Sequence, residues 1–208
     1  MGQYYKAVIL EEDKKTPKTF VESWNFENGA KLTEHSYIGN VMLGVVESLI
    51  QDNPSSLVWA GDYADTDNGA VENIYFLCET NGECVTPNSL NKKSHLKKDK
   101  LFMRYAKLSD KNNRYIINTT KKEFVDKTKC PYYLWNGTHK FALHPLALLT
   151  AEGNQRGGGD YYGSNEHLVG SWSRDMISVS NTKPTDDYVE IIPNFVEDYY
   201  KKNVIYPG

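Results

Sequence analysis

One segment of the chain has a clear helical pattern, whereas short β-prone runs are spread along most of its length. An apolar face recurs at helical spacing between residues 40 and 50, formed by Met42, Val45, Val46, Leu49 and Ile50. Asn40 is placed to cap the first turn, and the Asp-Asn-Pro stretch 52–54 ends the helix. The sequence therefore predicts one principal helix in a chain made mostly of strands.

Five runs rich in β-branched and aromatic residues predict strands, at residues 4–10, 19–24, 57–60, 115–119 and 176–180. The second run is predicted to pair antiparallel with the first across the charged turn 11–15. Because no βαβ unit repeats, the fold class is expected to be α+β, with a mainly antiparallel sheet and the principal helix packed on one face.

The remaining segments are expected to join these elements within a single domain, residues 1–208. Residues 73–79 and 121–129 each allow a short helix, and the latter also allows a turn. Residues 81–112 are polar and rich in Lys and Asn, so an irregular excursion is expected there. The apolar run 140–150 contains His144 and Pro145 and is expected to act as a strand that leads into a glycine-rich segment.

Composition limits the partners and the compartment. A net charge of −3 gives no general attraction to DNA or to an anionic membrane, and no apolar stretch reaches the roughly 18 residues of a membrane span. Cys78, Cys84 and Cys130 make an odd number of cysteines with no Cys-x-x-Cys motif. With no signal peptide, they indicate free thiols in the cytoplasm. The basic run 92–100 has no aromatic residues to stack bases, so a solvated loop is expected there.

The most site-like segment is 153–160, which reads Gly-Asn-Gln-Arg-Gly-Gly-Gly-Asp. Three glycines in a row suit a backbone that turns with positive φ or approaches a ligand, and their N–H groups can surround an anion. Arg156 offers a planar guanidinium for phosphate or carboxylate. No Walker or G-x-G-x-x-G motif is present, and a plain surface loop is the alternative. The expected ligand-binding residues here are Asn154, Arg156, Gly157, Gly158, Gly159 and Asp160.

Two Trp-x-x-Asp blocks, 59–62 and 172–175, are the next candidates. Trp59 or Trp172, or a tyrosine, would stack on a base, and Arg174 would help hold an anion. Asp62 is a further ligand-binding candidate, which with Asp65 could bind a divalent cation or act as a general base. The alternative for the first block is an Asp-rich turn. The alternative for the second block is that Arg174 and Asp175 simply pair with neighbouring charges. For His144 a satisfied core or edge role is favoured over a catalytic one, and the sequence contains neither a Ser or Cys nucleophile motif nor a zinc-ligand spacing.

Separated blocks resemble a family of bacterial and phage proteins that begin Met-Gly-Gln-Tyr-Tyr and contain a Gly-Asn-Gly-Arg-Gly-Gly-Gly-Asp loop. These blocks are residues 1–6, 58–65, 115–126, 144–145, 152–160 and 170–175. Gln155 stands where the family has Gly, and Trp-Ser-Arg-Asp stands where some members have Trp-Ala-Gly-Asp. The resemblance implies no activity. It implies that the blocks assemble one site in a phage or mobile-element protein, with Gln3 and Tyr5 in its lining; a plain core role for Tyr4 or Tyr5 is the alternative.

Three functions remain open from the sequence, and no cofactor can be named. The first is binding of an anionic, nucleotide-like small molecule, as in the sequestration of a host defence signal. The second is inhibition of a host defence protein by direct contact. The third is a metal-assisted hydrolase or transferase acting on a nucleotide-like substrate, which requires Asp62, Asp65, Asp160 and Asp175 to converge.

Overall fold

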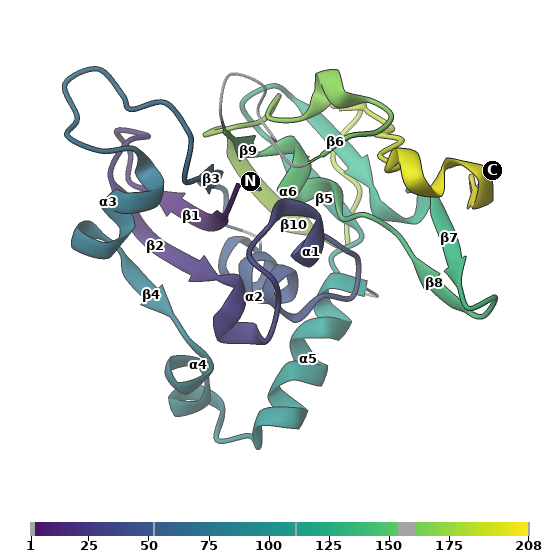
Figure 1. Ribbon diagram of the computed structural model, residues 1–208, viewed down its shortest axis with the longest axis horizontal. Coiled ribbons are helices and arrows are strands. Elements are labelled where there is room, and N and C mark those ends of the chain that lie inside the picture. Colours follow the sequence, from purple (N-terminus) through teal and green to yellow (C-terminus); the bar gives the residue numbers. More distant parts are fainter. Residues whose placement is uncertain (1–2, 52, 111, 154–160, 208) are drawn as a thin grey trace.

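A mixed β-sheet forms the centre of the protein, in a computed structural model that describes residues 3–51, 53–110, 112–153 and 161–207 (Figure 1). Within these residues, nine strands join the sheet in the order β11–β6–β5–β10–β3–β1–β2–β4, and β9 lies beside β3. The strands are β1 (Tyr5–Leu10), β2 (Pro17–Glu22), β3 (Ser55–Gly61), β4 (Glu83–Val85), β5 (Tyr115–Asn118), β6 (Glu123–Asp126), β9 (Ala151–Glu152), β10 (Met176–Ser180) and β11 (Val189–Glu190).

The α+β class is confirmed, but the sheet is mixed rather than mainly antiparallel. β1 pairs antiparallel with both β2 and β3, as expected for the first two runs, and β10 pairs antiparallel with β3 and β5. Three pairings are parallel: β2 with β4, β3 with β9, and β6 with β11. Each parallel partner is only two or three residues long, so the sequence has too little alternation to reveal it.

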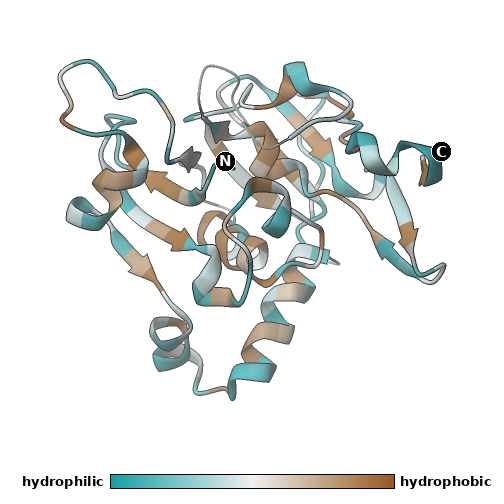
Figure 2. Ribbon diagram, in the orientation of Figure 1, coloured by the Kyte–Doolittle hydropathy of each residue, from teal (hydrophilic) through white to brown (hydrophobic). Residues whose placement is uncertain are grey.

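Helices cover both faces of this sheet. The helical elements are α1 (Leu32–His35), α2 (Val41–Ile50), α3 (Ile74–Asn81), α4 (Pro87–Ser94), α5 (Lys98–Asp110) and α6 (Pro145–Leu149), with short 3₁₀ turns η1 (Ser23–Phe26), η2 (Lys127–Lys129), η3 (Glu166–Leu168) and η4 (Asp198–Asn203). Tyr5 and Ala7 of β1 join the core with α2, whereas Val8 and Leu10 join the core with α3. This alternation follows from the two-residue period of a strand. Figure 2 shows hydrophobic residues gathered in the sheet and α2, with hydrophilic ones on the outer helices and loops.

The helix predicted at residues 40–50 is present as α2, and the Asn40 side chain accepts hydrogen bonds from the N–H groups of Met42 and Leu43. It is not the only principal helix. The expected irregular excursion at 81–112 instead contains β4, α4 and the 13-residue α5. α5 packs along α2 so closely that a Cβ on Gly44 would lie 1.8 Å from the Tyr105 carbonyl oxygen. Residues 98–110 form a helix although their sequence is polar, because they pack on α2.

Two other expectations need correction. Of the short helix or turn expected at 121–129, residues 121–122 form a turn and residues 127–129 form η2, but residues 123–126 form strand β6, because they pair with β5 at the sheet. The apolar run 140–150 is not a strand throughout: Pro145 opens α6, and His144 caps it by accepting a hydrogen bond from the Leu146 N–H at 3.2 Å. Proline suits the first turn of a helix because its missing N–H has no helical partner there.

A second, three-stranded sheet lies at the C-terminal side of the molecule (Figure 1). It consists of β7 (Tyr132–Trp135), β8 (His139–Phe141) and β12 (Val204–Ile205). The 3₁₀ turn η4 precedes β12 and brings aromatic residues onto this hairpin. Across the described residues, none of the helices has both the length and the apolar character needed to cross a membrane.

Candidate functional site

At the end of β3, the two tryptophan blocks lie next to β9, the short strand that leads into the glycine-rich segment. β9 lies parallel to β3, with Trp59 opposite Ala151 and Ala60 opposite Glu152. The backbone N–H of Trp172 donates to the carbonyl of Leu149, the last residue of α6, at 2.7 Å. Three segments that are far apart in the sequence are therefore side by side immediately before residue 153.

Arg174 fixes this arrangement by binding two carboxylates at once. Its Nε donates to Glu152 Oε2 at 2.8 Å, and its Nη2 forms a second bond with Glu152 Oε1. Nη1 donates to Asp67 Oδ2 at 2.7 Å, and Ser173 Oγ donates to Glu152 Oε2 at 2.7 Å. These contacts raise the pKa of Arg174 although its partial burial opposes them. We call Arg174, Glu152 and Asp67 the arginine clamp; it ties residue 152 to the loops after β3 and before β10.

The anion-holding role expected for Arg174 does not fit this geometry. A guanidinium has five N–H donors, and here its charge is already matched by two carboxylates. The side chain is 19% exposed, so a further anion would compete with Glu152 and Asp67 rather than meet a free cation. Arg174 also has a left-handed backbone, with φ of 60°, a conformation that costs a non-glycine residue about 1–2 kcal/mol. Its role is to position the segment that leads to residue 153.

Gln3 and Tyr5, which were expected to line the site, lie beside Gly61 at the end of β3. The Tyr5 hydroxyl donates to Gln3 Oε1 at 2.9 Å, and both residues are buried. A Cβ on Gly61 would lie 2.4 Å from Gln3 Nε2 and 2.9 Å from the Glu152 carbonyl oxygen, so only glycine permits this approach. Gln3 therefore packs directly against Gly61 at the end of β3, next to the pairing of this strand with β9.

Asp62 joins the beginning of β1 to the end of β3. Its Oδ1 accepts a hydrogen bond from the Tyr4 N–H at 3.0 Å, and its own N–H donates to the Tyr4 carbonyl at 3.0 Å. Its carbonyl oxygen accepts from Asn73 Nδ2 at 3.1 Å. The expected ligand-binding carboxylate is thus already used to hold two segments together.

Both tryptophans are structural rather than exposed stacking platforms. Trp59 is fully buried, and its Nε1–H donates to His35 Nε2 at 2.8 Å, while His35 Nδ1 donates to the Gly29 carbonyl. Burial lowers the pKa of His35 to about 4, so the ring accepts this bond as a neutral imidazole. Trp172 is also fully buried and donates to Glu123 Oε2 at 2.7 Å. Stacking by either indole would require the core to open.

Three tyrosines of the candidate blocks and of the residues after the glycine-rich segment present their rings to solvent. Tyr4 and Tyr63, which flank the Asp62 junction, are 46% and 47% exposed. Tyr162 is 63% exposed and directly follows the buried Tyr161. Sequence reasoning allowed a tyrosine to stack but did not name Tyr63 or Tyr162. The alternation of buried and exposed residues at positions 161–162 becomes visible only with the fold.

The far end of the glycine-rich segment is held as firmly as its beginning. The Tyr161 hydroxyl donates to the Ser164 carbonyl at 2.6 Å and accepts from the Val196 N–H at 2.9 Å. Its ring meets Phe195 edge to face with centroids 5.6 Å apart. Asn154, Arg156, Gly157, Gly158, Gly159 and Asp160 themselves lie outside the described residues.

The carboxylates required for a metal-assisted enzyme do not gather in the part of the chain that the structure describes. Asp175 accepts a hydrogen bond from Asn118 Nδ2 at 2.8 Å, Asp65 is exposed, and Asp62 is held by Tyr4. No group of three or more His, Cys, Asp or Glu side chains suited to a metal ion occurs among the described residues. Asp160 lies outside them.

His144 belongs to a buried charge network that sequence reasoning missed. Its Nε2 donates to Glu47 Oε1 at 2.9 Å, and the same oxygen lies 2.6 Å from Lys127 Nζ. Lys127 also donates to the Ser109 carbonyl at 2.8 Å. Burial lowers the pKa of His144, consistent with a neutral ring that also caps α6. This is the satisfied core histidine that the sequence favoured.

Comparisons with protein-family models, with curated proteins and with solved structures found no match to this chain.

Proposed function

We propose that the protein binds a small anionic, nucleotide-like molecule through residues 153–160. The observation that carries this proposal is the anchoring of both ends of that segment. Glu152 is held by the arginine clamp and Tyr161 by two hydrogen bonds to the 164–196 region. Binding loops are commonly presented in this way by a rigid scaffold.

The roles within the site divide between the loop and its support. Arg156 is the candidate for the anion, because a guanidinium can bind phosphate in a bidentate manner and Arg174 is already neutralised. Backbone N–H groups of Gly157, Gly158 and Gly159 are suited to surround the same anion. Tyr63 is a half-exposed ring available to stack on a base.

The family resemblance adds a biological setting to this proposal. In a phage or mobile element, a protein that binds a nucleotide-like molecule without turning it over would sequester a host defence signal. Sequestration requires only affinity and a folded scaffold. It therefore agrees with described carboxylates that are used in structural contacts rather than gathered around a metal.

A thermal-shift screen tests the binding proposal. The protein is heated with inorganic phosphate and with linear and cyclic mono-, di- and oligonucleotides, and a hit is retested with Arg156→Ala. Arg104→Ala serves as the matched control, because Arg104 is an exposed arginine on α5. A shift that disappears in Arg156→Ala and persists in Arg104→Ala supports the proposal. No shift with any ligand, or equal shifts in both variants, refutes it.

Direct contact with a host protein is the second candidate, favoured by the exposed rings of Tyr4 and Tyr63 beside Asp62 and of Tyr162 after the glycine-rich segment. Tyrosine is enriched at protein interfaces because it buries a large area with little loss of side-chain entropy. Retention of a host protein by the wild type, lost in a Tyr63→Ser/Tyr162→Ser variant that still binds the nucleotide-like hit, would favour this candidate for the tyrosine surface.

A further inference from the structure

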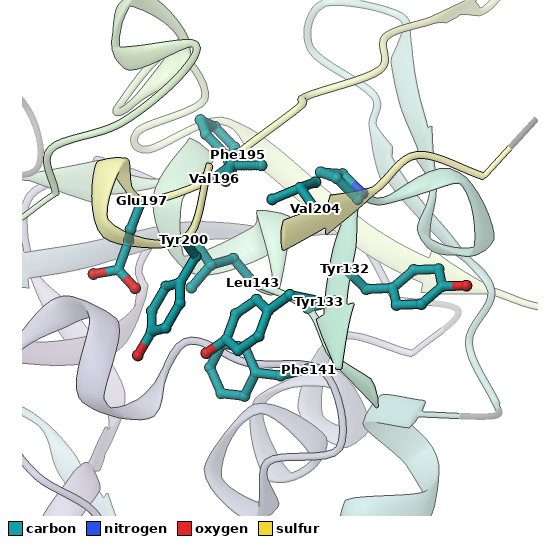
Figure 3. Close-up of a pocket in the computed structure, with 11 residues that line it drawn as sticks. Tyr132, Tyr133, Phe141, Leu143, Phe195, Val196, Glu197, Tyr200 and Val204 are labelled. Atoms are coloured by element: carbon teal, nitrogen blue, oxygen red, sulfur yellow. The ribbon is translucent and has the colours of Figure 1, made fainter. Parts of the chain in front are cut away.

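A groove lined by aromatic rings and carboxylates lies away from the glycine-rich segment, between the β7–β8 hairpin, α1 and η4. Its volume is about 360 Å³, within the range of small-molecule sites. The side chains that define it are Tyr133, Phe141, Tyr199, Tyr200, Glu34 and Glu197. Figure 3 shows a neighbouring pocket that shares Tyr133, Phe141, Glu197 and Tyr200 with the groove; in it the phenol oxygens of Tyr133 and Tyr200 and the Glu197 carboxylate point to the same side of the cluster.

The rings form two walls at nearly right angles. Tyr133 and Tyr200 are stacked, with centroids 4.1 Å apart and planes 12° apart, and Phe141 supports Tyr133 at 4.9 Å. Tyr199 stands at 88° to Tyr200, with centroids 4.9 Å apart. Tyr199 is 88% exposed, so its ring is not required to fill the core. In such an edge-to-face pair the positive edge of one ring meets the negative face of the other, and the exposed Tyr199 ring keeps surface available to a ligand.

The charge of the groove matches these ring faces. Glu197 and Glu34 are acidic, and none of the described residues that line the groove is basic. Burial raises the pKa of Glu197, while a hydrogen bond with Thr33 acts in the opposite direction. A cation in the groove would stabilise this partly desolvated carboxylate.

The same hairpin already contains one ammonium–aromatic contact. Lys140 Nζ lies 4.1 Å from the ring centroid of Tyr132, the residue next to Tyr133. Because neighbouring strand residues point to opposite faces, Tyr132 and Tyr133 present separate surfaces. The Tyr132 ring is occupied by Lys140 of this chain. The groove that Tyr133 lines contains aromatic rings and carboxylates, and none of the described residues in its lining is a cation.

We propose that this groove binds a small organic ammonium cation. The exposed ring of Tyr199 would contact the alkylated nitrogen, since a cation over an aromatic face is attracted by the ring quadrupole. The Glu197 carboxylate would supply the opposite charge. A compact cation suits the groove volume, and an alkylated ammonium loses less hydration on entering than a metal ion does.

A titration followed by protein NMR tests this assignment. Tetramethylammonium chloride is added to the ¹⁵N-labelled protein, with sodium chloride as the ionic-strength control and tert-butanol as an uncharged ligand of similar shape. Saturable shifts confined to amides near Tyr133, Phe141, Glu197 and Tyr200, absent with sodium chloride and tert-butanol, are expected. No saturation, or equal shifts with tert-butanol, would overturn the proposal and leave a merely apolar patch.

Two variants separate the ring contribution from the charge. Tyr199→Leu keeps an apolar side chain without the ring, and Glu197→Gln keeps the shape without the charge; each is expected to weaken binding about 2- to 5-fold. Tyr206→Leu is the control, because Tyr206 is 58% exposed in the same C-terminal stretch and does not line the groove. Binding that is unchanged in both groove variants, or weakened equally by Tyr206→Leu, contradicts the proposal.

Discussion

The arginine clamp gives the sharpest test of how the scaffold holds the glycine-rich segment. Arg174→Met keeps a long side chain and the same left-handed backbone, so the main loss is the guanidinium with its bonds to Glu152 and Asp67. The three side chains are 19–25% exposed. Their contribution should therefore exceed that of an exposed pair, about 0.2–1 kcal/mol, and remain below the 3–5 kcal/mol for breaking a fully buried one.

We expect Arg174→Met to lower the free energy of unfolding by about 2–3 kcal/mol, because two carboxylates lose their shared cation. For a chain of this size the melting temperature would fall by roughly 4–12 °C. Urea titration followed by tryptophan fluorescence measures the change, since Trp172 is buried beside the clamp. A double-mutant cycle with Glu152→Gln should give a coupling free energy of about 1–2 kcal/mol.

A coupling below about 0.5 kcal/mol would refute the reasoning, because the clamp would then be no stronger than an ordinary surface ion pair. Lys201→Met is the control. Lys201 pairs with Asp198, and their side chains are 50% and 63% exposed. Its effect on the free energy of unfolding should stay within about 0.5 kcal/mol.

Two buried positions, His35 and Gly44, give further testable predictions. Because burial lowers the pKa of His35 from 6.5 to about 4, the unfolded state takes up a proton that the folded state does not. The free energy of unfolding should fall by up to about 3 kcal/mol as pH drops from about 6.5 to about 4. Urea titrations across this range should show a weaker pH dependence in His35→Gln than in wild type, and an unchanged one in the exposed-residue control His167→Gln. Gly44→Ala should lower stability by about 1–3 kcal/mol in the same assay, because its Cβ would meet the α5 backbone. A neutral Gly44→Ala would contradict the close α2–α5 packing.

Local signals in the sequence were enough to predict some elements. The Asn40 cap and the apolar face of α2 lie within a few residues of one another, so helix and cap were both predicted correctly. The pairing of β1 with β2 follows from two β-prone runs around a short charged turn. α5 was missed because its surface is polar; its packing on the core around α2 depends on Phe102, Tyr105 and the missing side chain at Gly44, which no local composition reveals.

The site shows the same limit. The structure places the blocks around Tyr5, Trp59 and Trp172 beside β3, but the contacts of their side chains were not predicted. Arg174 is separated from Asp67 by 107 positions and from Glu152 by 22, so their ion pairs could not be predicted from spacing. Likewise, the full burial of Trp59 follows from its place in a central strand rather than from its Trp-x-x-Asp motif.

The most direct test of anion binding is isothermal titration calorimetry with the strongest nucleotide-like hit. Wild type, Arg156→Ala and Arg104→Ala are compared at fixed ionic strength. If Arg156 holds the anion, its replacement should weaken binding about 10-fold or more, since a charge-assisted hydrogen bond contributes about 1.5–3 kcal/mol. Arg104→Ala should bind as wild type does. Equal affinities for wild type and Arg156→Ala would contradict the proposed site.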